Sequence, residues 1–108
     1  MSANVTYHSV AKTSDLNKGE AKQVVIGKKE IAIYNLDGKF YATDDICTHA
    51  YASLADGYIE GDRVECPLHG GCFEIKTGKA CTPPCVEDLK TYTVKIEGDQ
   101  IFVGLPRG

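Results

Sequence analysis

The sequence predicts an all-β fold, an antiparallel β-sandwich or barrel that serves as the base for a small lobe. Apolar and polar residues alternate along several short segments, as they do in half-buried strands, and helical periodicity is nearly absent. Glycine-containing turns recur between these segments, which is typical of antiparallel connections. The chain has 108 residues, the length of one ordinary domain, so we expect residues 1–108 to form a single unit.

The expected elements are short strands joined by tight turns. Asp37-Gly38 and Gly98-Asp99 each lie between two alternating runs, and both residue types tolerate the positive φ that a tight hairpin needs. One short helical turn is expected to start within residues 14–16. The predicted strands are, in chain order, Lys22–Ile26, Glu30–Leu36, Phe40–Tyr41, Arg63–Cys66, Cys72–Ile75, Thr91–Glu97 and Ile101–Val103.

The alternation breaks down between about residues 44 and 78, where glycine-rich loops replace it. This segment contains Cys47, His49, Cys66 and His69, whose side chains are of the types that bind metals. A domain of this size buries only about two-thirds of its unfolded surface, so a metal centre that ties loops together would add stability. We therefore expect residues 44–78 to form a small metal-binding lobe on the β base.

Composition excludes several classes of function. Twelve Lys and Arg residues against fifteen Asp and Glu residues give a net charge of −3, and the basic residues form no run, so nucleic acid is not an expected partner. The first residues lack the basic and apolar regions of a signal peptide, and no segment approaches the roughly 20 apolar residues of a membrane span. We expect a cytoplasmic protein that does not bind membranes. Five cysteines without a secretory signal indicate metal ligands rather than a disulfide scaffold, at least where the cysteines have ligand spacing.

Two short motifs contain the four candidate ligands. Cys47-Thr48-His49 and Cys66-Pro67-Leu68-His69 each supply one thiolate and one imidazole. This donor set fits a tetrahedral zinc site, or a two-iron cluster in which two His replace two Cys on one iron. Zinc modules usually take two ligands of one kind from each loop, whereas two mixed loops suit a centre of two metals. The spacing therefore favours the two-iron cluster over zinc and over a chance arrangement.

The same loops resemble those of the Rieske family, whose members bind a 2Fe-2S cluster with this paired motif. Within that family the chain is similar to the ferredoxin components of bacterial aromatic-ring-hydroxylating dioxygenase systems, of the naphthalene, biphenyl and carbazole kind. The resemblance implies one 2Fe-2S cluster per chain, with Cys47 and Cys66 on an inner iron and His49 and His69 on an outer iron. It covers about residues 20–103 and includes Cys66–Gly71, Tyr41–Ile46, Asp56-Gly57, Glu60-Gly61, Thr77–Lys79 and Leu89–Tyr92.

Through this resemblance the chain is expected to be an electron carrier in the catabolism of aromatic hydrocarbons and not an enzyme. It would take electrons from a flavoprotein NAD(P)H reductase and pass them to a terminal Rieske oxygenase, acting as a monomer. Once His49 and His69 are assigned only His8 remains, which is too few for the mononuclear iron of an oxygenase. A glycine-rich dinucleotide fingerprint is also absent from the sequence. The alternative is a Rieske-like small subunit of an assimilatory nitrite reductase.

The resemblance also predicts a low reduction potential. The Rieske subunits of respiratory complexes have an extra Cys in each cluster loop, paired as a disulfide, where this chain has Ala52 and Leu68. They also have hydroxyl donors to the cluster where this chain has Gly71 and Phe73. Fewer hydrogen bonds to sulfur stabilise the reduced cluster less, so the potential is expected near the low end of the roughly −150 to +300 mV Rieske range.

Three cysteines lie outside the two ligand motifs, and apolar and acidic residues lie near the motifs in the sequence. Cys72 is interpreted as a buried packing residue, whereas Cys81 and Cys85 are assigned no ligand role and their function is left open. An apolar tip with a charged rim suits a transient redox contact, the alternative being an ordinary solvated surface. The predicted tip consists of Ala50, Tyr51, Leu68, Pro83 and Pro84, and the predicted acidic rim of Asp44, Asp45, Asp56, Glu87 and Asp88.

Overall fold

The computed structural model describes residues 5–47, 52–67, 71–81 and 88–106. The base consists of β1 (Val5–Lys12), β2 (Ala21–Ile26), β3 (Lys29–Leu36), β4 (Lys39–Asp44), β8 (Thr91–Glu97) and β9 (Gln100–Pro106). The lobe contains β5 (Tyr58–Glu60), β6 (Arg63–Glu65) and β7 (Cys72–Glu74). Two single turns of 3-10 helix are η1 (Thr13–Asp15) and η2 (Leu54–Asp56), and η1 confirms the helical turn predicted near residue 14.

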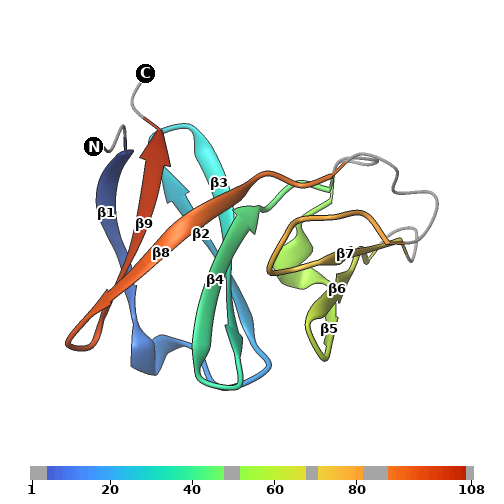
Figure 1. The fold of residues 1–108 in the computed structure, drawn as a ribbon, viewed down its shortest axis with the longest axis horizontal. Coiled ribbons are helices and arrows are strands. Elements are labelled where there is room, and N and C mark those ends of the chain that lie inside the picture. The colour runs from blue at the N-terminus through green and yellow to red at the C-terminus, as the bar shows by residue number, and fades with distance from the viewer. Residues whose placement is uncertain (1–4, 48–51, 68–70, 82–87, 107–108) are drawn as a thin grey trace.

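The strands pair into two antiparallel sheets. The larger sheet has the order β1-β9-β8-β4-β3-β2, and the smaller one has the order β5-β6-β7. The larger sheet curls into a half-barrel, and the smaller sheet lies beside it on the side of β4 (Figure 1). This arrangement confirms the predicted all-β fold with a base and a small lobe. In the described part of the chain, no helix is both long and apolar enough to cross a membrane.

The sequence indicated β1 only as a strand-like segment around His8, without bounds, and gave no prediction for β5. The pairing of β1 with β9 contains an irregularity between Ser9 and Ala11, which interrupts the two-residue period on which the prediction depended. The strand β5 has only three residues, of which Tyr58 and Glu60 are exposed. Tyr58 and Ile59 are adjacent apolar residues, so the segment does not alternate, and only the pairing of β5 with β6 identifies this strand.

Both predicted hairpin turns are present. Asp37 and Gly38 have φ values of 56° and 93° between β3 and β4, and Gly98 has a φ of 60° between β8 and β9. The Asn35 side chain supports the first turn, because its Oδ1 accepts a hydrogen bond from the Gly38 N–H at 2.8 Å. Aspartate and glycine therefore occupy the left-handed region in a turn whose geometry requires it.

Two hydrophobic clusters fill the fold, and β3 contributes to both. Ile31 and Ile33 face the cluster inside the base, whereas Ala32 and Tyr34 face the cluster between base and lobe, as the alternation of side chains along a strand requires. The cluster between base and lobe consists of Ala32, Tyr34, Cys47, Leu54, Val64, Cys66, Phe73, Ile75 and Leu89. Both predicted cysteine ligands are thus part of the core that joins the two sheets.

Two glycines permit close backbone contacts in the lobe. A Cβ atom at Gly57 would lie 2.2 Å from the Glu65 carbonyl oxygen, and one at Gly78 would lie 2.2 Å from the Leu89 carbonyl oxygen. Gly78 also has a φ of +78°. Any other residue at these two positions would have to displace backbone. Glycine therefore permits the close approach of residue 57 to Glu65 and of residue 78 to Leu89.

Candidate metal centre

The first cluster loop leaves the end of β4 and returns to η2. Ile46 forms an isolated antiparallel bridge with Ser53, and the Cys47 N–H donates to the Ala52 carbonyl at 3.0 Å. Cys47 is only 4% exposed. The base of the loop is therefore closed by backbone pairing, and this pairing holds the Cys47 side chain inside the core.

The second cluster loop joins β6 to β7. The Cys66 N–H donates to the Gly71 carbonyl at 2.7 Å, and Glu65 pairs with Cys72 in the sheet. Cys66 is 1% exposed. This loop is thus also closed at its base, directly at the predicted ligand.

The fold brings the two predicted cysteine ligands into one buried cluster. Cys47 and Cys66 both pack there with Phe73, which is fully buried on β7. Two thiols enclosed by apolar side chains, each at the base of its own loop, fit the thiolate side of an iron-sulfur cluster. His49 and His69 lie outside the described residues. The same holds for Ala50, Tyr51, Leu68, Pro83, Pro84, Cys85 and Glu87.

The structure corrects the interpretation of Cys72. Cys72 and Cys81 form a disulfide with their Cα atoms 5.5 Å apart, so Cys72 is not simply a packing residue. Phe73 bridges to Ala80 and the Cys81 N–H donates to the Cys72 carbonyl, which places the two cysteines opposite each other across a hairpin. This pair was not predicted from the sequence, because an odd number of cysteines without a secretory signal argued against disulfides. Cys47 and Cys66 take no part in this disulfide.

The predicted acidic rim is wrong at Asp45. Its side chain is 0% exposed, and its carboxylate accepts hydrogen bonds from Gln23 Nε2 at 2.6 Å and Ser53 Oγ at 2.7 Å. Asp56 and Asp88 are exposed, as a rim requires. The sequence contains no local signal for the contact between Gln23 and Asp45, because they belong to different segments and meet only when β2 packs beside the loop.

Asp44 is partly exposed but is engaged in a local network. The Tyr92 hydroxyl donates to Asp44 Oδ1, and Lys29 Nζ lies 3.8 Å from the same oxygen. Burial raises the pKa of the Tyr92 hydroxyl, and its hydrogen bond to Asp44 and the charge of that carboxylate raise it further. These contacts connect β4, β8 and β3 just before the chain enters the first cluster loop.

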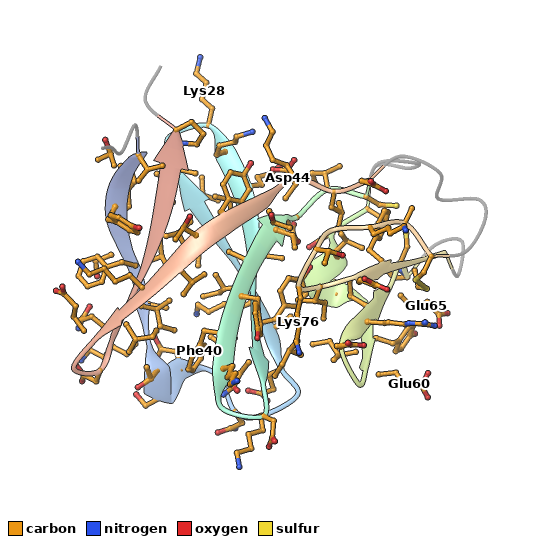
Figure 2. All side chains as sticks on the ribbon, in the orientation of Figure 1. Lys28, Phe40, Asp44, Glu60, Glu65 and Lys76 are labelled. Atoms are coloured by element: carbon orange, nitrogen blue, oxygen red, sulfur yellow. A yellow bond between two sulfur atoms is a disulfide. The ribbon has the colours of Figure 1, made fainter. Side chains whose placement is uncertain are left out.

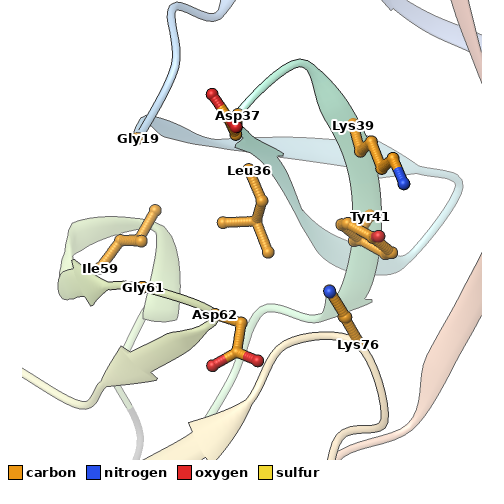
Figure 3. A pocket seen from close by; sticks show the side chains of 9 residues that line it. All are labelled: Gly19, Leu36, Asp37, Lys39, Tyr41, Ile59, Gly61, Asp62 and Lys76. Carbon is orange, nitrogen blue, oxygen red and sulfur yellow. The ribbon is translucent and has the colours of Figure 1, made fainter.

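A pocket lies between base and lobe, and neither Cys47 nor Cys66 lines it. Leu36 and Tyr41 of the base and Ile59 and Asp62 of the lobe surround this pocket (Figure 3). Its volume is about 470 Å³. Within residues 5–47, 52–67, 71–81 and 88–106, no three His, Cys, Asp or Glu side chains are grouped to hold a metal ion. The complete lining is Gly19, Leu36, Asp37, Lys39, Tyr41, Ile59, Gly61, Asp62 and Lys76.

Comparison with known families identifies the centre. The Rieske 2Fe-2S domain family matches residues 6–93. The chain belongs to this Rieske family. Its cofactor is a 2Fe-2S cluster, which confirms the prediction of a two-iron centre over the zinc alternative.

The similar proteins include ferredoxins of oxygenase systems. The ferredoxin component of the naphthalene 1,2-dioxygenase system of Pseudomonas putida is 46% identical over 92 residues, covering 85% of this chain and 88% of the relative. The biphenyl dioxygenase ferredoxin subunit of Pseudomonas sp. strain KKS102 is 43% identical, covering 95% of each chain. A chain in the complex of reduced oxygenase and oxidized ferredoxin of carbazole 1,9a-dioxygenase has a TM-score of 0.88 at 35% identity, covering 94% of this Rieske chain and 95% of the other.

A more distant similarity concerns the predicted alternative. A putative NADPH nitrite reductase small subunit has a TM-score of 0.76 at 25% identity, covering 91% of this Rieske protein and 97% of the other chain. Both values are below those of the ferredoxin chain from the carbazole 1,9a-dioxygenase complex. The comparisons therefore support the nitrite reductase alternative less than the ferredoxin one.

Proposed function

We propose that Cys47, His49, Cys66 and His69 bind the 2Fe-2S cluster and that this Rieske protein carries single electrons between two other proteins. The observation that carries the proposal is the burial of Cys47 and Cys66 in one apolar cluster, each at the closed base of its loop. When bound, the cluster supplies a site that reversibly gains one electron. The proposal covers residues 1–108 as one domain, with residues 44–78 as its cluster-binding lobe.

The surrounding residues keep the cysteines in an apolar environment. Leu54 and Phe73 are fully buried in the same cluster as the two cysteines, and the Gly71 carbonyl accepts the hydrogen bond of the Cys66 N–H. Gly71 and Phe73 have no hydroxyl group to donate. Because hydrogen bonds to sulfur favour the reduced cluster, their absence from these two side chains supports a potential in the lower part of the Rieske range.

The electron donor in this proposal is a flavoprotein NAD(P)H reductase and the acceptor is a terminal Rieske oxygenase of an aromatic-ring dioxygenase system. Similarity along most of the chain to ferredoxin components of naphthalene and biphenyl dioxygenases supports this assignment. Similarity to a ferredoxin found together with its oxygenase supports the acceptor. The chain would act in the cytoplasm as a monomer and would catalyse no reaction by itself.

The proposed contact with partners is centred on the loop tips, and we propose that exposed acidic residues of the lobe contribute to it. Glu60 and Glu65 point away from the base on the smaller sheet (Figure 2). Asp56 and Asp88 are also exposed. A negative surface beside an apolar tip would accelerate the approach of a basic partner without making the complex long-lived.

The test is a reconstitution with single omissions. The purified protein is combined with a flavoprotein reductase and a terminal dioxygenase from the same operon, and NADH-driven formation of an aromatic cis-diol is measured. We expect product only when all three proteins are present. Full activity without this chain would refute the dioxygenase assignment, and reduction of nitrite in a complex that contains the chain would establish the alternative.

A further inference from the structure

Asp45 connects the base to the returning arm of the first cluster loop. Its carboxylate is fully buried two residues before Cys47. It accepts hydrogen bonds from Gln23 Nε2 at 2.6 Å, from Ser53 Oγ at 2.7 Å and from the Ala55 N–H at 2.9 Å. Gln23 belongs to β2, whereas Ser53 and Ala55 lie on the arm that returns from the loop. One side chain therefore ties an edge strand of the base to the segment that closes the loop.

Backbone hydrogen bonds extend this attachment to Cys47. The Asp45 carbonyl accepts from the Leu54 N–H at 2.6 Å, and the Asp45 N–H donates to the Glu30 carbonyl at 3.1 Å. Beside them, the Cys47 N–H donates to the Ala52 carbonyl at 3.0 Å. The position of Cys47 thus depends on the returning arm, and the arm depends on Asp45.

The Asp45 carboxylate also places a negative charge in the core. The three donors described above are neutral groups, so they satisfy its oxygens without supplying a positive charge. Burial, and to a smaller extent the charge of Asp45, raises the pKa of the nearby Tyr34 hydroxyl. Tyr34 belongs to the same buried cluster as Cys47 and Cys66, so the field of the carboxylate extends into the region of the predicted ligands.

We propose that Asp45 is a positioning residue for the cluster, which holds Cys47 through residues 52–55 and keeps the reduction potential low through its charge. This inference rests on the ligand role of Cys47 in the proposed function. A fixed negative charge opposes the addition of an electron nearby, and loss of the charge therefore raises the potential. Loss of one hydrogen-bond donor to the carboxylate loosens the loop but keeps the charge.

Three variants of the cluster-loaded protein separate these two effects. Asp45→Asn removes the charge, Ser53→Ala removes one donor, and Asp62→Asn removes a charge from the exposed turn between β5 and β6 as a matched control. Protein-film voltammetry measures the potential, and the decay of visible absorbance with an iron chelator measures cluster loss. We expect Asp45→Asn to raise the potential and to lose the cluster about tenfold faster, the scale typical for residues that support metal ligands.

The control variants are expected to differ from Asp45→Asn in defined ways. Ser53→Ala should lose the cluster faster at an unchanged potential, and Asp62→Asn should match the original protein in both measurements. An Asp45→Asn potential that does not rise overturns the electrostatic role, and an unchanged rate of cluster loss overturns the positioning role. If Asp45→Asn retains too little cluster for voltammetry, Ser53→Ala decides, because an unchanged rate in that variant overturns the proposal.

Cys47→Ala distinguishes this inference from the proposed function. If Cys47→Ala keeps the original visible spectrum, the ligand assignment itself is wrong. If Cys47→Ala loses the cluster while the Asp45 and Ser53 variants behave as the original protein, both roles of Asp45 are wrong and the ligand role of Cys47 stands.

Discussion

Cys72 and Cys81 are joined by a disulfide across the hairpin that begins with β7. Cys72 is the register partner of Glu65, the residue immediately before Cys66. The disulfide therefore links the strand that follows the second cluster loop to residues 80–81, which pair with that strand. Its position indicates a structural role for these two cysteines, which was not predicted from the sequence.

Peptide mapping of protein alkylated without reduction should recover residues 72 and 81 in one cross-linked species. The double variant Cys72→Ser/Cys81→Ser should lower the free energy of unfolding by about 2 kcal/mol, because the unfolded chain regains the freedom that the cross-link removes. Cys85→Ser is the control and should keep the cross-linked species. Recovery of both thiols in alkylated form would contradict the disulfide.

His69→Ala tests the ligand assignment in the second cluster loop. Since the metal joins the two loops, we expect iron and acid-labile sulfide to fall well below about two of each per chain and the lobe to become less stable. Iron analysis and EPR of the dithionite-reduced protein provide the measurement. His8→Ala is the control, because His8 lies on β1 of the base. An unchanged spectrum in His69→Ala would rule out this residue as a ligand.

Gly71→Ser tests the origin of the low potential. If the added hydroxyl reaches a cluster sulfur, it should favour the reduced state by about 1 kcal/mol, which raises a one-electron potential by about 40 mV. Phe73→Tyr probes the second position. Because Phe73 is fully buried, the added hydroxyl also needs a hydrogen-bond acceptor if the fold is not to be destabilised. Voltammetry of the double variant should show an upward shift, and no shift would refute the placement of both residues.

Gly78→Ala should destabilise the lobe by about 3 kcal/mol or more. The new Cβ would lie 2.2 Å from the Leu89 carbonyl oxygen at a residue with positive φ, so both overpacking and backbone strain contribute. Gly61→Ala is the matched control, since Gly61 also has positive φ but a Cβ there would have no described atom within 4 Å. Urea denaturation should show a loss of only about 1 kcal/mol for Gly61→Ala. Equal losses would mean that the contact with Leu89 is unimportant.

Leu68→Glu tests the proposed contact with redox partners. A charge in the apolar tip should slow electron transfer to the oxygenase by about tenfold or more and leave the visible spectrum intact, because the residue is not a ligand. Stopped-flow oxidation of the reduced protein by the oxygenase measures the rate. Transfer at the original rate would show that docking does not use this tip.

The cofactor class, the antiparallel fold and the hairpin turns could all be predicted from local patterns in the sequence. Cys47-Thr48-His49 and Cys66-Pro67-Leu68-His69 are short motifs in which residue type and spacing carry the chemistry. The Asp37-Gly38 turn is similarly local, because the φ preference of those two residues determines its geometry. Most strands could also be predicted locally, because the alternation of apolar and polar residues follows from the pleat of each strand.

The pairing of polar and sulfur-containing side chains across the molecule became evident only from the packed fold. Asp45 follows Asp44 in an acidic pair that suggests a solvated surface, yet it is buried against Gln23 and Ser53. Cys72 bonds to Cys81 only because the chain after β7 turns back and pairs with that strand. Contacts between separate segments depend on how strands and loops pack in three dimensions, and a single sequence contains no periodic or short-range pattern that specifies such pairs.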